Sequence, residues 1–438
     1  MKFYNRINEL NALNEAKRRS LSEGQMTVLM GRRRIGKTEL ARRCSDDKLL
    51  YFFVARKTET LLCDDFVREV ESQLSIPIGA RKSFVELFRF LLFYAEEHPF
   101  TLIIDEFQDF QRINPSIFSD IQREWDLHKT KSHINLIISG SVFSLMKRIF
   151  EDAKEPLFGR ASQTIWLNTF STNVLKEIIA DFNSNYTPDD LLALFAITGG
   201  VPWYVALLMD NAKTDKNNIL AYITEPNSPF INEGKNILIE EFGVDYVIHF
   251  SILTCIAGGQ LTRGEIENQL NTNNIGSYIA RLENYYQLIN KQLPIFAKEN
   301  SKKMRYSLND NFLDFWFRFF YKYQSYIANN ALEQLFRIIN RDYDSYSGFA
   351  LEHYFERKWR ETGYYTHIGK YWDRKGENEI DLIAVNEIDK IAEIYEIKKD
   401  KKRFDASVLQ KKVDVLLQNC PEMHDMSIKT GVLSLEDM

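Results

Sequence analysis

The sequence predicts an α/β fold, with a parallel sheet near the N-terminus and a smaller α/β unit at the C-terminus. Three observations support this prediction. Short apolar runs alternate with amphipathic stretches over the first 170 residues, a glycine-rich turn follows the first run, and residues 346–438 have the pattern helix, hairpin, strand, helix. Alternating strand and helix patterns are typical of a parallel sheet covered by helices. At 438 residues, the chain is long enough for about two to four domains.

Composition excludes several classes of protein. Apolar residues make up 45% of the chain, but no apolar run reaches the roughly 18 to 20 residues that span a bilayer. The N-terminus lacks the apolar segment of a secretory signal, and the four cysteines have no metal-ligand or disulfide spacing. We therefore expect a soluble, cytoplasmic protein with no membrane partner. The net charge of -5 means that any nucleic-acid binding must come from local basic patches.

Five apolar runs are expected to form the N-terminal sheet. They contain many β-branched and large apolar residues and are separated by helical patterns. The runs are Gln25 to Met30, Leu49 to Val54, Thr101 to Ile104, Ile134 to Ser139 and Gln163 to Leu167.

The turn after the first run matches a phosphate-binding loop of the Walker A type, directly before a helical segment. Glycines let backbone N–H groups surround phosphate oxygens, and the following helix N-terminus points at the anion. Lys37 would reach the β- and γ-phosphates, while the hydroxyl of Thr38 would bind Mg²⁺. The motif predicts a P-loop NTPase site for ATP and Mg²⁺. Its residues are Gly31, Arg32, Arg33, Arg34, Ile35, Gly36, Lys37, Thr38 and Glu39.

Two adjacent acids, Asp105 and Glu106, end the third run, as in a Walker B motif. Asp105 would hold Mg²⁺ together with Thr38, and Glu106 would orient and polarise the water that attacks the γ-phosphorus. Ser139 ends the fourth run. It is either a polar sensor of the γ-phosphate or an ordinary turn residue.

A lone arginine, Arg160, stands just before the last strand of the predicted sheet, at the end of Pro156-Leu157-Phe158-Gly159-Arg160. It is either a surface residue or a catalytic group that stabilises transition-state charge on the phosphate. The sequence does not decide between these interpretations.

Helical patterns dominate after the predicted sheet, which covers residues 1–170. Residues 171–244 are expected to form a helical lid, punctuated by Gly199-Gly200-Val201-Pro202. Residues 245–325 have the outline of a winged helix, with a hairpin of Leu288–Asn290 and Met304–Leu308 around the lysine-rich segment 298–303. The aromatic run 312–321 is expected to be a buried helix rather than a base-stacking platform. A connector is expected at 326–345, before the C-terminal domain at 346–438.

Together these motifs resemble the archaeal-type ATPases, which belong to the AAA+ and STAND side of the P-loop NTPases. The resemblance covers nearly the whole chain. It implies that the region of Arg6 and Glu9 borders an adenine pocket, and that a lid and a winged helix follow. It also implies a C-terminal restriction-endonuclease-like α/β domain of the PD-(D/E)XK type. The motifs are Phe3 to Leu13, the Walker A loop, Ile103 to Gln108, Ser139 to Ser141, Pro156 to Arg160, Gly199 to Tyr204 and Arg305 to Phe320.

The PD-(D/E)XK pattern asks for a helical acid, an acid on a hairpin strand and Glu-x-Lys on the next strand. Glu352, Asp381 and the pair Glu396 and Lys398 fill these positions. Residues i and i+2 of a strand share a face, so Glu396 and Lys398 would both point toward Asp381. Asp381 and Glu396 could hold Mg²⁺, with Lys398 orienting the attacking water. Gln410, on the next predicted helix, matches a glutamine that some members of this superfamily add.

Two functions are left open by the sequence. Either the chain is an ATP-controlled enzyme that cuts DNA or RNA, or it is an ATP-driven switch or adaptor whose C-terminal domain only binds. The basic run 398–403 either contacts phosphates or is simply solvated, and the winged helix either contacts nucleic acid or mediates protein contacts. A homo-oligomer is compatible with both functions.

Overall fold

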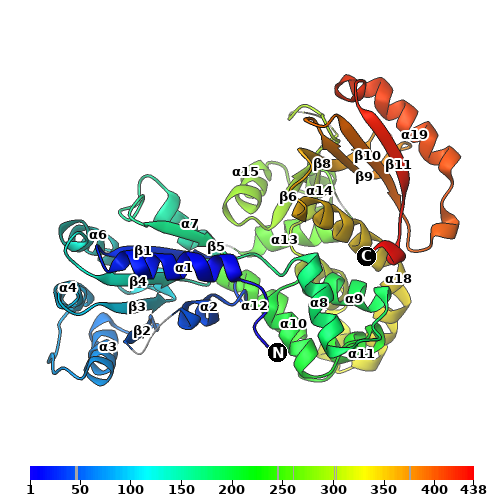
Figure 1. Cartoon of the computed structure of the whole chain (residues 1–438). Helices are drawn as coiled ribbons and strands as arrows, with labels where there is room; N and C mark the ends of the chain where they lie inside the picture. Colours follow the sequence, from blue (N-terminus) through cyan, green and yellow to red (C-terminus); the bar gives the residue numbers. More distant parts are fainter. Residues whose placement is uncertain (45–47, 244–245, 260, 300, 302, 374–375) are drawn as a thin grey trace. The chain divides into compact units, whose positions relative to one another are not determined.

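The computed structural model of the chain describes all residues except 45–47, 244–245, 260, 300, 302 and 374–375. It contains two compact units (Figure 1). One unit is Tyr4–Thr169, and the other combines Met1–Phe3 with Phe170–Met438. Within the described residues, no helix has the length and apolar character needed to cross a membrane.

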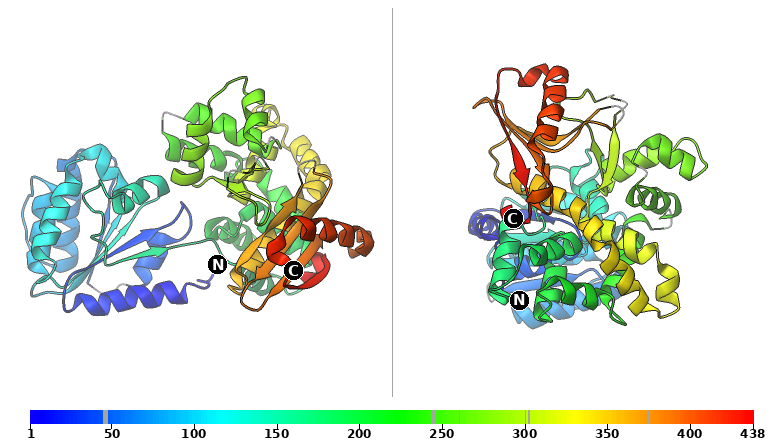
Figure 2. Two further views of the ribbon diagram at one scale, coloured as in Figure 1. Left: turned by 90° about the horizontal axis from the view of Figure 1, so that it is seen from above. Right: turned by 90° about the vertical axis from the view of Figure 1, so that its right-hand side faces the viewer.

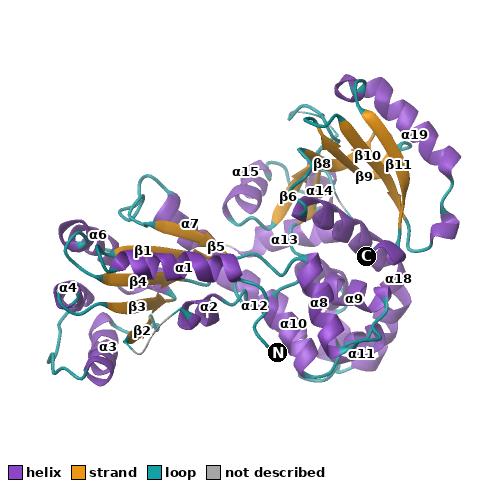
Figure 3. Ribbon diagram, viewed as in Figure 1, coloured by secondary structure: helices purple, strands orange, loops and turns teal. Residues whose placement is uncertain are grey.

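The unit Tyr4–Thr169 is built on a five-stranded parallel sheet with the order β2-β3-β4-β1-β5 (Figure 3). Every residue of β1, β3 and β4 is buried, as is typical of central parallel strands. The expected positions of all five strands are confirmed to within one residue at each end. The strands are β1 (Gln25–Met30), β2 (Leu49–Phe53), β3 (Phe100–Asp105), β4 (Ile134–Ser139) and β5 (Gln163–Trp166).

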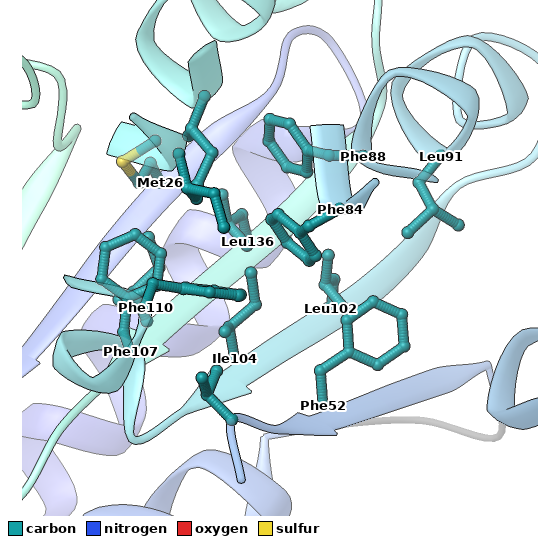
Figure 4. Close-up of a cluster of buried hydrophobic side chains, with 14 of the residues drawn as sticks. Met26, Phe52, Phe84, Phe88, Leu91, Leu102, Ile104, Phe107, Phe110 and Leu136 are labelled. Carbon is teal, nitrogen blue, oxygen red and sulfur yellow. The ribbon is translucent and has the colours of Figure 1, made fainter. Parts of the chain in front are cut away.

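Helices α3, α4 and α6 cover one face of this sheet and share an apolar core with it (Figure 4). Phe52 stacks on Phe66 with ring centroids 4.2 Å apart, and Phe84 packs against Phe110. Burial of such aromatic side chains stabilises the fold by roughly 2 kcal/mol each. The helices of the unit are α1 (Ile7–Ser20), α2 (Lys37–Arg43), α3 (Glu59–Leu74), α4 (Phe84–Tyr94), α5 (Phe110–Ile113), α6 (Ile117–His128) and α7 (Phe143–Glu151).

The second unit begins with five helices, where a helical lid was expected. A turn at Gly199 and Gly200 separates two of them, and a Cβ on Gly200 would lie only 2.7 Å from the carbonyl oxygen of Phe170. Pro202 then opens the next helix at a position where its missing N–H costs nothing. The expected boundary at 244 and 245 lies outside the described residues. The helices are α8 (Thr172–Phe182), α9 (Pro188–Thr198), α10 (Pro202–Asp210), α11 (Lys216–Ile223) and α12 (Pro229–Phe242).

Three further helices precede an antiparallel hairpin, in which β6 (Ile289–Gln292) pairs with β7 (Arg305–Leu308). Two residues of the lysine-rich segment, 300 and 302, lie outside the described residues. The segment after β6 reaches the C-terminal sheet: the amide of Ile295 donates to the carbonyl oxygen of Lys370 at 2.8 Å, and Ile295 joins the apolar core there. The helices are α13 (Tyr246–Ala257), α14 (Arg263–Gln269) and α15 (Gly276–Ala280).

The aromatic run forms α16 (Asn311–Phe315) and the π-helical turn η3 (Trp316–Tyr321). Its large apolar side chains other than Tyr321 are buried, and the indole nitrogen of Trp316 donates to the carbonyl oxygen of Ile231 at 2.7 Å. Gly234 leaves room for the indole, since a Cβ there would lie 2.3 Å from the ring. The expectation of a buried helix is confirmed.

A 30-residue helix, α18 (Leu332–Glu361), follows the short α17 (Gln324–Ala328). The expected boundary between a connector and a C-terminal domain, at 345 and 346, falls inside α18. Leu335, Ile339 and Tyr343 are buried at helical spacing, and this face continues through Tyr346 to Ala350. One continuous apolar face therefore makes one helix.

The C-terminal sheet has the order β11-β10-β9-β8. Strands β8, β9 and β10 form an antiparallel meander. Helix α19 packs on the sheet (Figure 2), and β11 then pairs in parallel with β10. The fourth strand, β11, was not predicted, because most of its residues are exposed or half-buried. The elements are β8 (His367–Trp372), β9 (Glu379–Asn386), β10 (Ile391–Ile397), α19 (Ala406–Asn419) and β11 (Ser427–Leu433).

Candidate functional site

The loop between β1 and α2 has a backbone that its glycines permit. Gly31 has a φ of 149°, and a Cβ there would lie 2.8 Å from the carbonyl oxygen of Leu167. Gly36 has a φ of 92° and directly precedes α2. Lys37 turns back over the loop and donates to the carbonyl oxygens of Gly31 at 2.7 Å and Arg32 at 2.8 Å. The loop thus holds an ammonium group beside the start of a helix, an arrangement that suits phosphate oxygens.

The other predicted loop residues lie in the same place. The three arginines 32–34 are half-buried, and Arg34 has a φ of 66°. Ile35 is buried, with its Cγ2 3.1 Å from the position of a Cβ on Gly31. Glu39 is exposed and pairs with Arg43 at 2.7 Å, so its side chain serves the surface of α2.

Asp105, at the end of β3, is the centre of a hydrogen-bond network. Its Oδ2 accepts from the hydroxyl of Thr38 at 2.7 Å and from that of Tyr51 at 2.8 Å. Its Oδ1 accepts from the hydroxyl of Ser139 at 2.6 Å and from the amide of Glu106 at 3.0 Å. The carboxylate is therefore held beside the loop hydroxyl, where hard oxygen ligands for Mg²⁺ would be needed.

Glu106 has a φ of 56°, a left-handed conformation that costs a non-glycine residue about 1 kcal/mol or more. Its Oε2 accepts from the side-chain amide of Gln108 and from the hydroxyl of Ser141, both at 2.6 Å. Gly140 permits this arrangement, because a Cβ there would lie 2.0 Å from Oε1 of Gln108. Backbone strain and two donors fix the carboxylate next to Asp105, as expected of a water-positioning group.

The resemblance places Arg6 and Glu9 beside the adenine. The two residues are in contact at the start of α1, where Arg6 precedes the helix and Glu9 lies in its first turn. The guanidinium of Arg6 is buried, donates to Glu9 at 3.1 Å and also donates to the carbonyl oxygen of Asn168. The two side chains are thus fixed near Asn168, two residues after the end of β5.

Arg160 lies near the amino ends of β1 and β5, whereas the phosphate loop lies at the carboxyl end of β1. Gln163 begins β5 and pairs with Thr27 near the start of β1, whereas the phosphate loop follows the end of β1. Arg160 pairs with Asp126 at 3.1 Å. Because the strands are parallel, the length of β1 separates Arg160 from Lys37 of the same chain.

The residues of the predicted C-terminal site come from three neighbouring elements of the second unit. Glu352 comes from α18, Asp381 from β9 and Glu396 from β10. Burial and then the charge of Glu352 raise the pKa of Asp381 to about 6, and Glu396 acts in the same direction. A hydrogen bond from the amide of Ile397, at 2.8 Å, opposes this rise. The same hydrogen bond places Asp381 beside Glu396, because Ile397 is the next residue of β10.

Lysines hold both glutamates of this cluster. Lys370 on β8 contacts Glu352 at 2.5 Å, while Lys398 and Lys412 each approach Glu396 to 2.9 Å. Burial disfavours the charged form of Glu396, but the two ammonium groups outweigh it and lower the pKa of this carboxyl. Within the described part of the chain, no three His, Cys, Asp or Glu side chains are gathered closely enough to hold a metal ion.

Gln410 is exposed on α19 and donates to Asp414 at 2.9 Å, on the same helix. In the basic run 398–403, Lys399 pairs with Asp344 at 3.0 Å and Lys401 with Asp437 at 3.1 Å. Part of this run therefore makes ion pairs within its own unit.

Two family descriptions match the chain. Residues 3–208 match an ATPase domain predominantly from Archaea, and residues 316–409 match a family described as Archaea bacterial proteins of unknown function. The uncharacterized protein MJECL04 of Methanocaldococcus jannaschii is 30% identical over 406 residues, which cover 90% of this chain and 87% of that protein. The chain belongs to the archaeal ATPase family.

A solved structure supports the fold of this chain. The Walker-type ATPase PABY2304 of Pyrococcus abyssi is 18% identical, has a TM-score of 0.53, and covers 72% of this chain and 96% of its own. The ORC2 protein of Aeropyrum pernix, in its ADPNP and ADP complexes, is 16% identical with a TM-score of 0.48, over 77% of this chain and 95% of its own. The family match makes the N-terminal unit an ATP-binding and ATP-hydrolysing domain.

Three polar residues of these sites could not be predicted from the sequence. Tyr51 lies in an apolar strand, and nothing in its neighbours indicates a contact with Asp105. Lys370 and Lys412 lie 18 and 16 residues from the glutamates that they contact. Ordinary sequence spacing carries no signal for such contacts, which only the fold creates.

Proposed function

We propose that this protein hydrolyses ATP with Mg²⁺ and couples hydrolysis to a metal-dependent nuclease centre that acts on nucleic acid. In the N-terminal unit, Thr38 and Asp105 hold the ion and Lys37 holds the phosphates. Glu106 polarises the attacking water. The bound ion supplies charge stabilisation for the transferring phosphoryl group. Ser139 acts through Asp105, to which it donates a hydrogen bond at 2.6 Å.

The observation that carries the nuclease proposal is the position of Asp381 beside Glu396: Oδ2 of Asp381 accepts from the amide of Ile397, the residue after Glu396, at 2.8 Å. Glu352 on α18 is tied to the same sheet through Lys370 of β8. The order helix, antiparallel meander, helix and parallel strand agrees with the PD-(D/E)XK fold that the resemblance implies. Carboxylate oxygens suit a hard divalent ion. Asp381 and Glu396 would hold that ion, and Lys398 would orient the water that attacks the phosphodiester.

Arg160 enters this proposal through a second copy of the chain. Arg160 lies at the opposite end of β1 from Lys37 of the same chain. It is therefore available to ATP bound by a neighbouring copy. A mixture of Lys37→Ala and Arg160→Ala chains tests this: each variant is expected to hydrolyse ATP slowly, and the mixture faster than either. An equal rate before and after mixing would mean that Arg160 is a surface residue without a role in hydrolysis.

A second candidate function is an ATP-driven switch whose C-terminal domain binds without cutting. It is favoured by the lysines that neutralise Glu352 and Glu396. The proposed winged helix also fits it, because Ile295 after β6 is packed into the C-terminal core. In this function the hairpin of β6 and β7 serves contacts within the chain.

A cleavage assay separates the two functions. The full chain is incubated with labelled DNA and RNA, with Mg²⁺ or Mn²⁺, and with or without ATP. Cleavage that is lost in Asp381→Ala, while ATP hydrolysis is kept, supports the nuclease. The matched control is Glu387→Ala, an exposed acid in the turn after β9, which is expected to cut normally. No cleavage of either nucleic acid would support the switch.

A further inference from the structure

Both carboxylate oxygens of Glu396 are occupied by lysine. The ammonium of Lys412 lies 3.2 Å from Oε1 and 2.9 Å from Oε2, and that of Lys398 lies 2.9 Å from Oε1. The side chains of Glu396 and Lys412 are only 12% and 18% exposed. A divalent ion bound by Glu396 would therefore have to take the place of an ammonium group.

The two lysines differ in how they are attached. Lys398 directly follows β10, two residues after Glu396, so the two side chains stay neighbours whatever is bound. Lys412 comes from α19, which is anchored on the sheet by Leu409 and Val413. Its flexible four-carbon stem lets the ammonium leave Glu396 while the helix stays in place.

Charge also favours an exchange. The carboxylates of Glu352, Asp381 and Glu396 are matched by the ammonium groups of Lys370, Lys398 and Lys412. Adding a divalent ion to a balanced cluster leaves an excess of positive charge in a partly buried place. Such a centre attracts an anion, and a released ammonium adds a further donor for it.

We propose that Lys412 is a placeholder cation, which occupies Glu396 before a divalent ion binds and then turns to a phosphate of the nucleic-acid substrate. This rests on the proposed nuclease function and adds a specific role to it. Metal and Lys412 compete for Glu396, whereas metal and substrate support each other. Removal of the ammonium therefore has opposite effects on the two ligands.

The test measures both ligands with the full chain and without nucleotide. Mn²⁺ is titrated calorimetrically into the unmodified protein and into Lys412→Met, and the signal that Asp381→Asn removes is assigned to the C-terminal site. Lys412→Met is expected to bind Mn²⁺ about five- to tenfold more tightly, in line with loss of one partly buried ion pair. It is expected to bind a fluorescent 20-nucleotide DNA or RNA about tenfold more weakly in Ca²⁺, since one charged phosphate contact is lost.

Lys411→Met is the matched control, because it removes the same charge from an exposed neighbouring position of α19. Its Mn²⁺ affinity is expected to stay unchanged, which separates competition at Glu396 from a general change in field. Lys412→Arg keeps the charge and is expected to bind Mn²⁺ like the unmodified protein. It is the variant to measure if Lys412→Met unfolds. Equal Mn²⁺ affinities of Lys412→Met and the unmodified protein would overturn the placeholder role and leave the nuclease proposal standing. Absence of any Asp381-dependent Mn²⁺ binding would overturn both.

Discussion

The hydroxyl oxygen of Tyr51 lies 2.8 Å from Oδ2 of Asp105, the same oxygen that accepts a hydrogen bond from Thr38. Burial and the charge of Asp105 raise the pKa of Tyr51 well above its ordinary value, so the phenol stays protonated and acts as a donor. The guanidinium of Arg42 lies over the Tyr51 ring, 4.3 Å from its centroid. Tyr51 thus links the second strand of the sheet to the carboxylate proposed to hold Mg²⁺.

Tyr51→Phe is expected to raise the Mg²⁺ concentration for half-maximal ATP hydrolysis about two- to tenfold, because one hydrogen bond that positions Asp105 is lost. The maximal rate at saturating Mg²⁺ should change little. Tyr94→Phe, a half-buried tyrosine of α4, is the control. An unchanged Mg²⁺ dependence would mean that Thr38 and Ser139 position Asp105 without help.

Lys37→Ala is expected to weaken ATP binding by about 100-fold or more, since the phosphates lose the charge-assisted hydrogen bonds of the ammonium that lies over the loop. Fluorescent ATP analogues measure this by titration. Lys131→Ala, an exposed lysine of the same unit, should bind as the unmodified protein does. Equal affinity and turnover in Lys37→Ala would contradict the assignment of the loop.

Glu106→Gln is expected to keep ATP affinity and to lower the rate of hydrolysis about 100-fold. The amide has nearly the shape of the carboxylate and can still accept from Ser141, but it cannot polarise water as an anion does. Single-turnover hydrolysis with bound ATP measures the chemical step directly. A rate equal to that of Glu97→Gln, an exposed control, would place the catalytic acid elsewhere.

Asp381→Asn is expected to stabilise the metal-free protein at pH 7.5 by about 1 to 3 kcal/mol. The pKa of Asp381 is raised from 3.8 to about 6 in the fold, so the folded chain binds the proton more tightly than the unfolded chain. The stability of the unmodified protein therefore falls as pH rises from 4 through 6 and stays lower above that range. Asparagine does not titrate, and its advantage should vanish below pH 4.

Thermal unfolding midpoints at pH 4, 5, 6 and 7.5 check this expectation. Addition of Mn²⁺ should raise the midpoint of the unmodified protein more than that of Asp381→Asn, since the variant lacks one ligand of the C-terminal site. A variant that is less stable than the unmodified protein at pH 7.5 would show that the carboxylate is favourably placed without metal.

Local signals were enough for the nucleotide site. Gly36, Lys37 and Thr38 are adjacent in sequence, and Asp105 ends a fully buried strand, so their positions follow from short-range patterns. The contact of Tyr51 with Asp105 joins residues 54 positions apart and has no such pattern. It depends on the pairing of β2 with β3, which sequence periodicity does not specify.

The C-terminal domain was harder to predict for the same reason. Glu352, Asp381, Glu396 and Lys398 could be named from order and spacing, but Lys412 could not, because it shares a site with Glu396 only through the packing of α19. The strand β11 has an exposed pattern, and its pairing with β10 alone reveals it. The long α18 showed that a buried face can continue across a boundary inferred from a change in the secondary-structure pattern.

The contact of Ile295 with Lys370 protects an open strand edge. β8 is the last strand of its sheet, and such edges pair readily with other chains. The segment after β6 covers part of this edge, through the bridge of Pro294 with Lys370 and the apolar side chain of Ile295. A fragment cut out at residue 316, where the C-terminal family match begins, would lose this cover. Its tendency to aggregate would reflect missing sequence from far upstream, and a fragment that carries 289–308 in addition should remain dispersed.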